Sequence, residues 1–152
     1  MELVPGIASG DVASPADMRR AVERLQGEVS KLPQYEPETK HYFHAGMYCR
    51  EVYRNAGVLV VGKVHKKAHF YVIASGTVCI TTDDGAKRVN GPAVLQCTPG
   101  TKRAVYAETP ATCMTFHIVN AKTVEEAERE LVEEDDNDMY LPGNRVRPEV
   151  LK

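Results

Sequence analysis

Five side chains that can carry charge or transfer a proton gather in two short stretches of the sequence. Lys63, His65 and His69 lie between two apolar segments, and Lys102 and Arg103 follow a glycine-containing turn. An imidazole with a pKa of about 6.5 can accept or release a proton at neutral pH. Lysine and arginine supply the fixed positive charge and the N–H donors that suit phosphate oxygens. These residue types predict a cationic site for a phosphate-bearing ligand, with groups able to perform acid-base chemistry.

Two predicted strands position the first of these stretches. Residues 58–64 and 70–73 are rich in β-branched and aromatic side chains and would be joined at residues 66–68. Side chains alternate along a strand. The alternation predicts inward faces made of Leu59, Val61, Lys63 and His65 on the first strand and of His69, Tyr71 and Ile73 on the second. Val58, Val60 and Val64 would then face away from the site and need a cover, from the amino-terminal helix or from a partner.

The residues at this spacing resemble the first motif of the cupin superfamily. The motif's positions for glycine, histidine, histidine, glutamate and glycine are occupied by Gly57, Lys63, His65, His69 and Gly76. Residues 98–103 resemble the second motif, with Arg103 at the position of its metal-binding histidine. The resemblance covers about residues 46–119 and implies a small β-sandwich or barrel of the jelly-roll type. Only two of the four positions that hold a metal ion in typical cupins carry a metal ligand here. We therefore expect no metal and no other cofactor.

Four segments, HYF, GKVHKKAH, PGTKRAVYA and LPGN, also resemble small cupin-domain proteins of tailed phages. This resemblance implies a protein of the infected host cell's cytoplasm. It also implies a role in evading bacterial immunity, by sequestering or cleaving a nucleotide signal. That implication rests on analogy of fold and context.

The composition is typical of one soluble domain. The chain has 152 residues, of which 43% are hydrophobic and 26% charged, and a net charge of −2. A charge this small predicts no binding to polymeric nucleic acid. No apolar run is long enough to span a bilayer and no amino-terminal targeting pattern is present, so we expect a cytoplasmic protein without a membrane partner. The widely spaced cysteines are expected to be free thiols: Cys49, Cys79, Cys97 and Cys113.

Three regions are predicted within this single domain. Residues 1–45 would form an arm, a helix that Ser14 caps and Pro33 ends, and a connector. Residues 46–120 contain a series of short strands, a pattern typical of a cupin-like β-sandwich or barrel, with 102–108 and 111–120 paired as the final hairpin. Residues 121–152 would form a helix over 124–134, capped by Thr123, and a tail. The predicted fold class is mainly β with a helix at each end, and we expect a homo-oligomer such as a homodimer.

Three functions remain open for the site, besides a purely structural role as a phage accessory protein. The first is binding of a small anionic, nucleotide-like ligand, which the protein would sequester. The second is metal-independent cleavage of a phosphodiester by a histidine pair, one neutral and one protonated. The third is a metal-dependent oxygenase or isomerase. The candidate catalytic residues are His65, His69 and His117, and the candidate ligand-binding residues are Lys63, Lys102, Arg103, Tyr71, Tyr106 and Thr115.

Overall fold

The computed structural model describes residues 3–8, 14–135 and 140–146. Its elements are α1 (Pro15–Val29), β1 (Glu38–His44), β2 (Met47–Arg54), β3 (Leu59–Val61), β4 (His69–Ser75), β5 (Thr77–Thr82), β6 (Gly85–Asn90), β7 (Ala93–Cys97), β8 (Ala104–Ala107), β9 (Ala111–Ile118), α2 (Val124–Leu131), β10 (Tyr140–Leu141) and β11 (Arg145–Val146). Neither described helix combines the length and the apolar character needed to cross a membrane.

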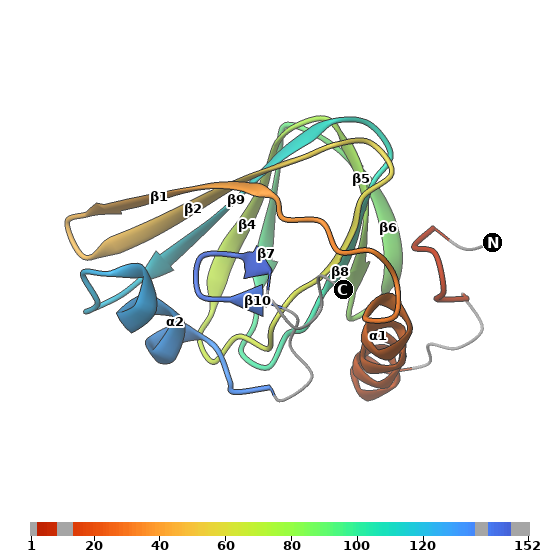
Figure 1. Ribbon diagram of the computed structural model, residues 1–152, viewed down its shortest axis with the longest axis horizontal. Coiled ribbons are helices and arrows are strands. Elements are labelled where there is room, and N and C mark those ends of the chain that lie inside the picture. The colour runs from red at the N-terminus through yellow and green to blue at the C-terminus, as the bar shows by residue number, and fades with distance from the viewer. Residues whose placement is uncertain (1–2, 9–13, 136–139, 147–152) are drawn as a thin grey trace.

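Two antiparallel sheets form a sandwich, with α1 and α2 at different places on its periphery (Figure 1). The larger sheet has the strand order β1-β2-β9-β4-β7, the smaller has the order β3-β8-β5-β6, and β10 pairs with β11. Buried side chains from both sheets meet in one core cluster, with Ile73 and Cys113 from the larger sheet and Val78 and Ile80 from the smaller. The predicted fold, mainly β with a helix in each terminal region, is confirmed.

The inner face of the larger sheet carries the polar residues of the site. β2 alternates along its length, and its inward side chains are Tyr48, Arg50, Val52 and Arg54. Pairing with β9 places His117 opposite Tyr48 and Thr115 opposite Arg50. On the other side of β9, β4 places Tyr71 opposite Thr115. Residues far apart in the sequence thus form neighbouring rows on one surface.

α1 covers the outer face of the smaller sheet. As predicted, Ser14 caps it, with its Oγ accepting a hydrogen bond from the backbone N–H of Asp17 at 3.2 Å. The apolar stripe packs against β3 and β5 and includes Met18, Val22 and Leu25. The helix was expected to continue as far as Pro33, but α1 ends at Val29 and Leu32 is 60% exposed.

Two expectations about the strands are wrong, and one arrangement of strands was not predicted. The predicted connector over 33–45 contains β1, which pairs along its whole length with β2. The two strands of the central stretch lie in different sheets, since β3 pairs with β8 whereas β4 pairs with β7 and β9. β8 and β9 likewise do not form a hairpin, because they belong to opposite sheets. Residue types indicate where strands occur, but crossings between sheets depend on long-range packing.

β3 is shorter than predicted, and its faces are reversed. Leu59 and Val61 pack toward α1, whereas Val60 faces the inside of the sandwich. The strand ends at Val61, and the N–H of Gly62 then donates to the carbonyl of Arg103 at 2.8 Å. The irregular segment that follows brings Lys63 and His65 back to the inner side. Lys63 and His65 therefore lie at the predicted site, but on an irregular segment after β3 and not on the strand itself.

α2 closes the end of the sandwich where the histidines lie. Thr123 caps it by accepting from the N–H of Glu126 at 3.2 Å, and it ends at Leu131, three residues earlier than predicted. The N–H of Lys66 donates to the carbonyl of Leu131 at 2.7 Å, and the N–H of Glu133 donates to that of Val64 at 2.9 Å. These backbone bonds fix the loop between β3 and β4 against the end of α2.

Candidate functional site

A cavity lies between the two sheets, with a volume of about 70 Å³ open to the centres of water molecules. Because a single water needs roughly 10–15 Å³ on this measure, the space can hold a small polar group. We call it the central cavity. Its lining consists of Pro37, Arg50, Val52, Arg54, Val60, Gly62, Lys63, His65, His69, Tyr71, Thr101, Arg103, Val105, Cys113, Thr115 and Asn144. This described lining includes three arginines, one lysine and two histidines, and contains no aspartate or glutamate.

Three imidazole rings meet at the end of the central cavity that α2 closes. His65 comes from the loop before β4, His69 begins β4, and His117 lies on β9. The ring centroids are 4.4 Å apart for His65 and His69, 4.7 Å for His69 and His117, and 5.6 Å for His65 and His117. The ring of Tyr48 stacks on the far side of His117, with centroids 5.9 Å apart. We call the three histidines the imidazole cluster.

Burial is the main influence on the protonation of the imidazole cluster, because it disfavours the charged form. Burial, and then the positive charge of Arg50, lower the pKa of His117 to about 3. Burial also holds the pKa of His65 well below its ordinary value, with smaller contributions from Arg50 and the other two histidines. The pKa of His69 is lowered mainly by burial, with Arg103 and Arg50 acting in the same direction. All three rings are therefore uncharged at neutral pH when no ligand is bound.

One carboxylate from α2 compensates the positive charge at this end of the central cavity. Glu128 accepts from Arg50 through Oε1, at 3.3 Å from Nη1, and lies with Oε2 3.4 Å from the Nζ of Lys63. The Glu128 side chain is buried, and those of Arg50 and Lys63 are nearly so. Two cations thus share one anion.

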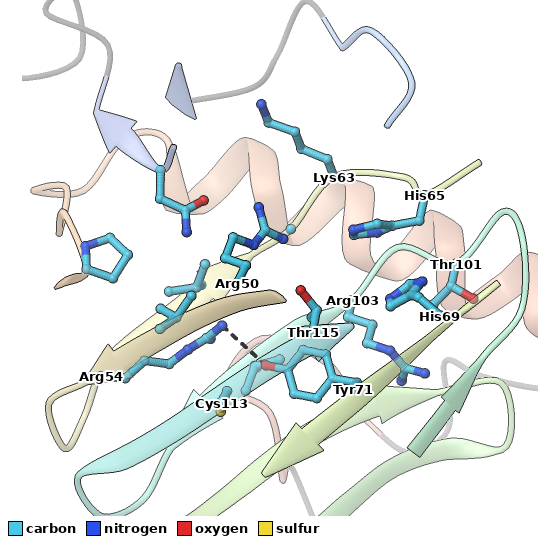
Figure 2. A pocket seen from close by; sticks show the side chains of 16 residues that line it. Arg50, Arg54, Lys63, His65, His69, Tyr71, Thr101, Arg103, Cys113 and Thr115 are labelled. Carbon is cyan, nitrogen blue, oxygen red and sulfur yellow. Dashed lines mark hydrogen bonds between the residues drawn. The ribbon is translucent and has the colours of Figure 1, made fainter. Parts of the chain in front are cut away.

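Arg54 and Arg103 lie on either side of the Tyr71 ring in the view of Figure 2. The Nη2 of Arg54 donates to the hydroxyl of Tyr71 at 3.3 Å. Arg103 is anchored differently, with Nη1 donating to the carbonyl of Thr81 at 2.6 Å and Nη2 to the Sγ of Cys97 at 3.1 Å. Neither guanidinium forms an ion pair with a described carboxylate.

Most of the predicted site residues come together. Six line the central cavity: Lys63, His65, His69, Tyr71, Arg103 and Thr115. The seventh, His117, borders it through the imidazole cluster. The structure contradicts the placement of the other two. The Nζ of Lys102 pairs with Asp135 at 2.9 Å, and Tyr106 packs against the α1 cluster. Neighbouring residues of an extended chain point to opposite sides, so the inward Arg103 and Val105 turn Lys102 and Tyr106 outward.

Sequence reasoning missed two of the three arginines. Arg50 and Arg54 occupy alternate positions of β2, in phase with the buried Tyr48 and Val52. That phase was the available signal, because a charged side chain at an inward position of a strand needs a polar partner. Thr101, Cys113 and Asn144 also line the central cavity, and no pattern in the sequence distinguished them.

The metal ion that typical cupins hold does not fit the imidazole cluster as it is arranged. An ion bound by two histidines lies near the plane of both rings, because the nitrogen lone pairs are in those planes. The rings of His65 and His117 are stacked within 6° of parallel, so their planes do not meet at a shared point nearby. Within residues 3–8, 14–135 and 140–146, no three histidine, cysteine or acidic side chains are arranged to hold an ion.

Comparison with known proteins shows likeness of fold. No protein-family model matches the chain, and no curated protein sequence does. A salicylate 1,2-dioxygenase from Pseudaminobacter salicylatoxidans has a TM-score of 0.51 at 13% identity, over 66% of this chain and 32% of the enzyme chain. This chain therefore spans about a third of that dioxygenase. A cupin superfamily protein from Desulfitobacterium hafniense has a TM-score of 0.49 at 13% identity, over 59% of this chain and 83% of its own. A cupin protein from Bacteroides fragilis has a TM-score of 0.47 at 18% identity, over 60% and 85% of the two chains. At these identities the likeness concerns the fold alone, which is the cupin-like β-sandwich predicted from the sequence.

Proposed function

We propose that the central cavity binds a small phosphate-bearing molecule of the nucleotide class and sequesters it. One observation carries the proposal: a cavity with four cationic side chains and no acidic side chain in its described lining. Several donors there are buried without a hydrogen-bond partner, namely the Nε atoms of Arg50, Arg54 and Arg103, the Nη1 of Arg54 and the Oγ1 of Thr115. Buried donors of this kind are costly unless an acceptor reaches them. Phosphate oxygens would supply acceptors and negative charge together.

Arg103 tests the proposal, with its neighbour Lys102 as the matched control. Replacing Arg103 by methionine removes a cation from the central cavity, whereas Lys102→Met removes a buried cation that pairs with Asp135 and does not line the cavity. We expect Arg103→Met to weaken binding of inorganic phosphate and of a panel of linear and cyclic nucleotides about ten- to hundredfold, because charge-assisted hydrogen bonds contribute about 1.5–3 kcal/mol. Lys102→Met should leave the affinity unchanged. Isothermal titration calorimetry measures both, and circular dichroism confirms that the variants are folded. Equal affinity in the parent and Arg103→Met would contradict the proposal.

Sequestration is favoured over cleavage by the protonation of the imidazole cluster. Cleavage by a histidine pair needs one neutral and one protonated ring, but burial keeps all three pKa values low in the empty site. Cleavage would therefore require the ligand's negative charge to bring a proton to the cluster. Titrations in buffers of different ionisation enthalpy measure such proton uptake, and chromatography of the incubated nucleotides separates intact ligand from product. Recovery of intact ligand after heat denaturation supports sequestration, whereas a product that disappears in His69→Ala would support catalysis.

The immune-evasion role remains a prediction from the phage resemblance. Its ligand would be a nucleotide signal made by the infected bacterium, and its site of action the host cytoplasm. Expression of the parent protein in bacteria that use such a signal, beside the Arg103→Met variant, tests it. Protection of an infecting phage by the parent and not by the variant is the expected result.

A further inference from the structure

Arg54 is a buried cation whose position the fold alone does not explain. The whole residue is buried at the end of β2, and only its Nη2 donates a hydrogen bond, to Tyr71. Its Nε and Nη1 are buried without a partner. A buried charge is costly unless it is paired and hydrogen-bonded. A buried arginine with unpartnered donors is suited to binding an anionic ligand that enters the cavity.

Arg103 is a second cation of this kind, and the other two cations of the central cavity differ from it. Its Nη atoms are held by neutral acceptors, a carbonyl oxygen and a thiol, and its Nε is buried without a partner. Arg50 and Lys63, in contrast, share the carboxylate of Glu128. The uncompensated positive charge of the described lining therefore resides on Arg54 and Arg103.

The two guanidinium groups are held apart by the architecture of the sandwich. Arg54 lies at the last position of β2, in the larger sheet, and is held there by its hydrogen bond to the hydroxyl of Tyr71. Arg103 precedes β8 and is anchored to β5 and β7 through Thr81 and Cys97. Figure 2 shows Arg54 at the hydroxyl end of Tyr71 and Arg103 beyond the opposite end of that side chain.

We propose that Arg54 and Arg103 form two separate anion subsites in the central cavity, so that the ligand carries two phosphate groups joined by a spacer. This inference rests on the proposed function, since both subsites belong to the same cavity. It narrows the ligand class from any phosphate-bearing molecule to molecules that carry two phosphate groups. Tyr71, between the subsites, would contact the spacer.

The test compares ligands with one and two phosphate groups. The probes are a series of straight-chain alkanediol bisphosphates of increasing length and the matching alkyl monophosphates, titrated by calorimetry. At the length that spans both subsites, the parent should bind the bisphosphate about ten- to hundredfold more tightly than the monophosphate, because the second group binds intramolecularly. Arg54→Gln should abolish this advantage and leave monophosphate affinity nearly unchanged, because a single phosphate binds mainly at the Arg103 subsite, which this variant retains. Arg88→Gln, which changes an exposed arginine paired with Glu108, should keep the advantage.

Failure of this inference is distinguishable from failure of the proposed function. A parent that binds monophosphates and bisphosphates equally at every length, or an Arg54→Gln variant that keeps the bisphosphate advantage, overturns the two-subsite inference and leaves the function standing. A parent that binds neither class of probe overturns both.

An independent observation concerns the outer face of the larger sheet. Strand register places Tyr42, Phe116 and Phe70 in one row across β1, β9 and β4, since Cys49 of β2 pairs with both Tyr42 and Phe116. Further large apolar side chains flank this row. Together they form what we call the outer apolar face: Tyr42, Met47, Phe70, Val94, Phe116 and Ile118, which are 37–81% exposed. The equivalent face of the smaller sheet is covered by α1.

We infer that a second copy of this chain covers the outer apolar face, in a two-fold symmetric dimer. At about 200 Å² for each large side chain, these exposures leave roughly 600 Å² of apolar surface, more than most monomers expose and close to the 800 Å² or so that each partner of a stable complex buries. Sheets pack face to face through such surfaces. The charged pair on this face, Lys40 and Glu51, is mutually compensated at 3.8 Å, so two copies do not repel each other there.

Light scattering after size-exclusion chromatography tests the dimer. The parent should have the mass of two chains, and Phe70→Glu and Ile118→Glu should each give the mass of one chain with an unchanged circular dichroism spectrum. Leu32→Glu is the matched control, because Leu32 is an exposed apolar residue near the end of α1, away from this face. A monomeric parent, or a dimer that survives both substitutions on the face, would overturn the inference.

Discussion

Replacing Arg54 by methionine should make the protein more stable and, at the same time, a poorer binder. Methionine fills a similar volume without charge. The substitution removes two buried donors that lack partners, each costing about 1–3 kcal/mol, and sacrifices one hydrogen bond to Tyr71 of about 1.5–3 kcal/mol. Replacing buried ionic groups by apolar ones is often stabilising by about 1–4 kcal/mol. We expect a net gain of about 2 kcal/mol in the free energy of unfolding, or roughly 4–8 °C in Tm for a chain of this size.

Thermal and urea unfolding, each with and without a bisphosphate probe, measure both effects. The probe should raise the Tm of the parent and raise that of Arg54→Met much less, because stabilisation by a ligand follows its affinity. Arg50→Met is the matched control. It removes a partner of the buried Glu128 and should lower the free energy of unfolding by about 2 kcal/mol. If Arg54→Met were less stable than the parent by as much as the control, Arg54 would be a structural residue and the reasoning from its unpaired donors would be refuted.

Three further outcomes are expected. Acidification from pH 7 to pH 5 should lower the free energy of unfolding by on the order of 2 kcal/mol through His117. The pKa of this histidine is about 3 in the folded protein and about 6.5 in the unfolded protein. The stability that His117 contributes above pH 6.5 is therefore lost as the pH falls toward 3. Urea unfolding measured at several pH values in this range should show that the free energy of unfolding depends less on pH in His117→Gln than in the parent. His44→Gln, which changes an exposed histidine, is the control and should behave like the parent. Elemental analysis should find no stoichiometric iron, manganese or zinc, and one ion per chain that disappears in His65→Ala would contradict this. Gly76→Ala should destabilise far more than Gly57→Ala: both have positive φ, but a Cβ at Gly76 would lie 2.3 Å from the carbonyl oxygen of Pro110, whereas one at Gly57 meets nothing within 4 Å. The midpoints of urea unfolding of the two variants measure this difference. Equal losses of stability in both variants would contradict the steric explanation.

The sequence was sufficient to predict most strands of the two main sheets, with β1 as the exception, and insufficient to pair them. β2 lies in the region predicted to contain short strands, and its inward and outward residues alternate without interruption. β3 was misread because Gly62 ends the strand early, and no local pattern shows where an extended segment stops being a strand. Pairing of β8 with β3 and β5, rather than with β9, is decided by contacts between distant residues.

The same limit applies to the site. Lys63, His65 and His69 were found through residue type and motif spacing, which are local properties. Lys102 was included because it is a cation that follows the same glycine-containing turn as Arg103, although two adjacent extended residues cannot both face one cavity. The carboxylate of Glu128, which pairs with Arg50 and Lys63, comes from α2, and its approach to these residues depends on how that helix docks. The pairing of this carboxylate with the cations depends on tertiary structure, so the local sequence does not predict it.

The place of β9 between β2 and β4 affects how the protein can be synthesised. β9 is the last long strand to leave the ribosome, yet it lies in the middle of the larger sheet. At about 5–20 residues per second, several seconds separate the completion of β2 from the arrival of β9. During that time β2 and β4 have no strand between them, and unpaired strand edges beside apolar side chains are prone to aggregate. We therefore expect the nascent chain to depend on chaperones until residue 118 has emerged.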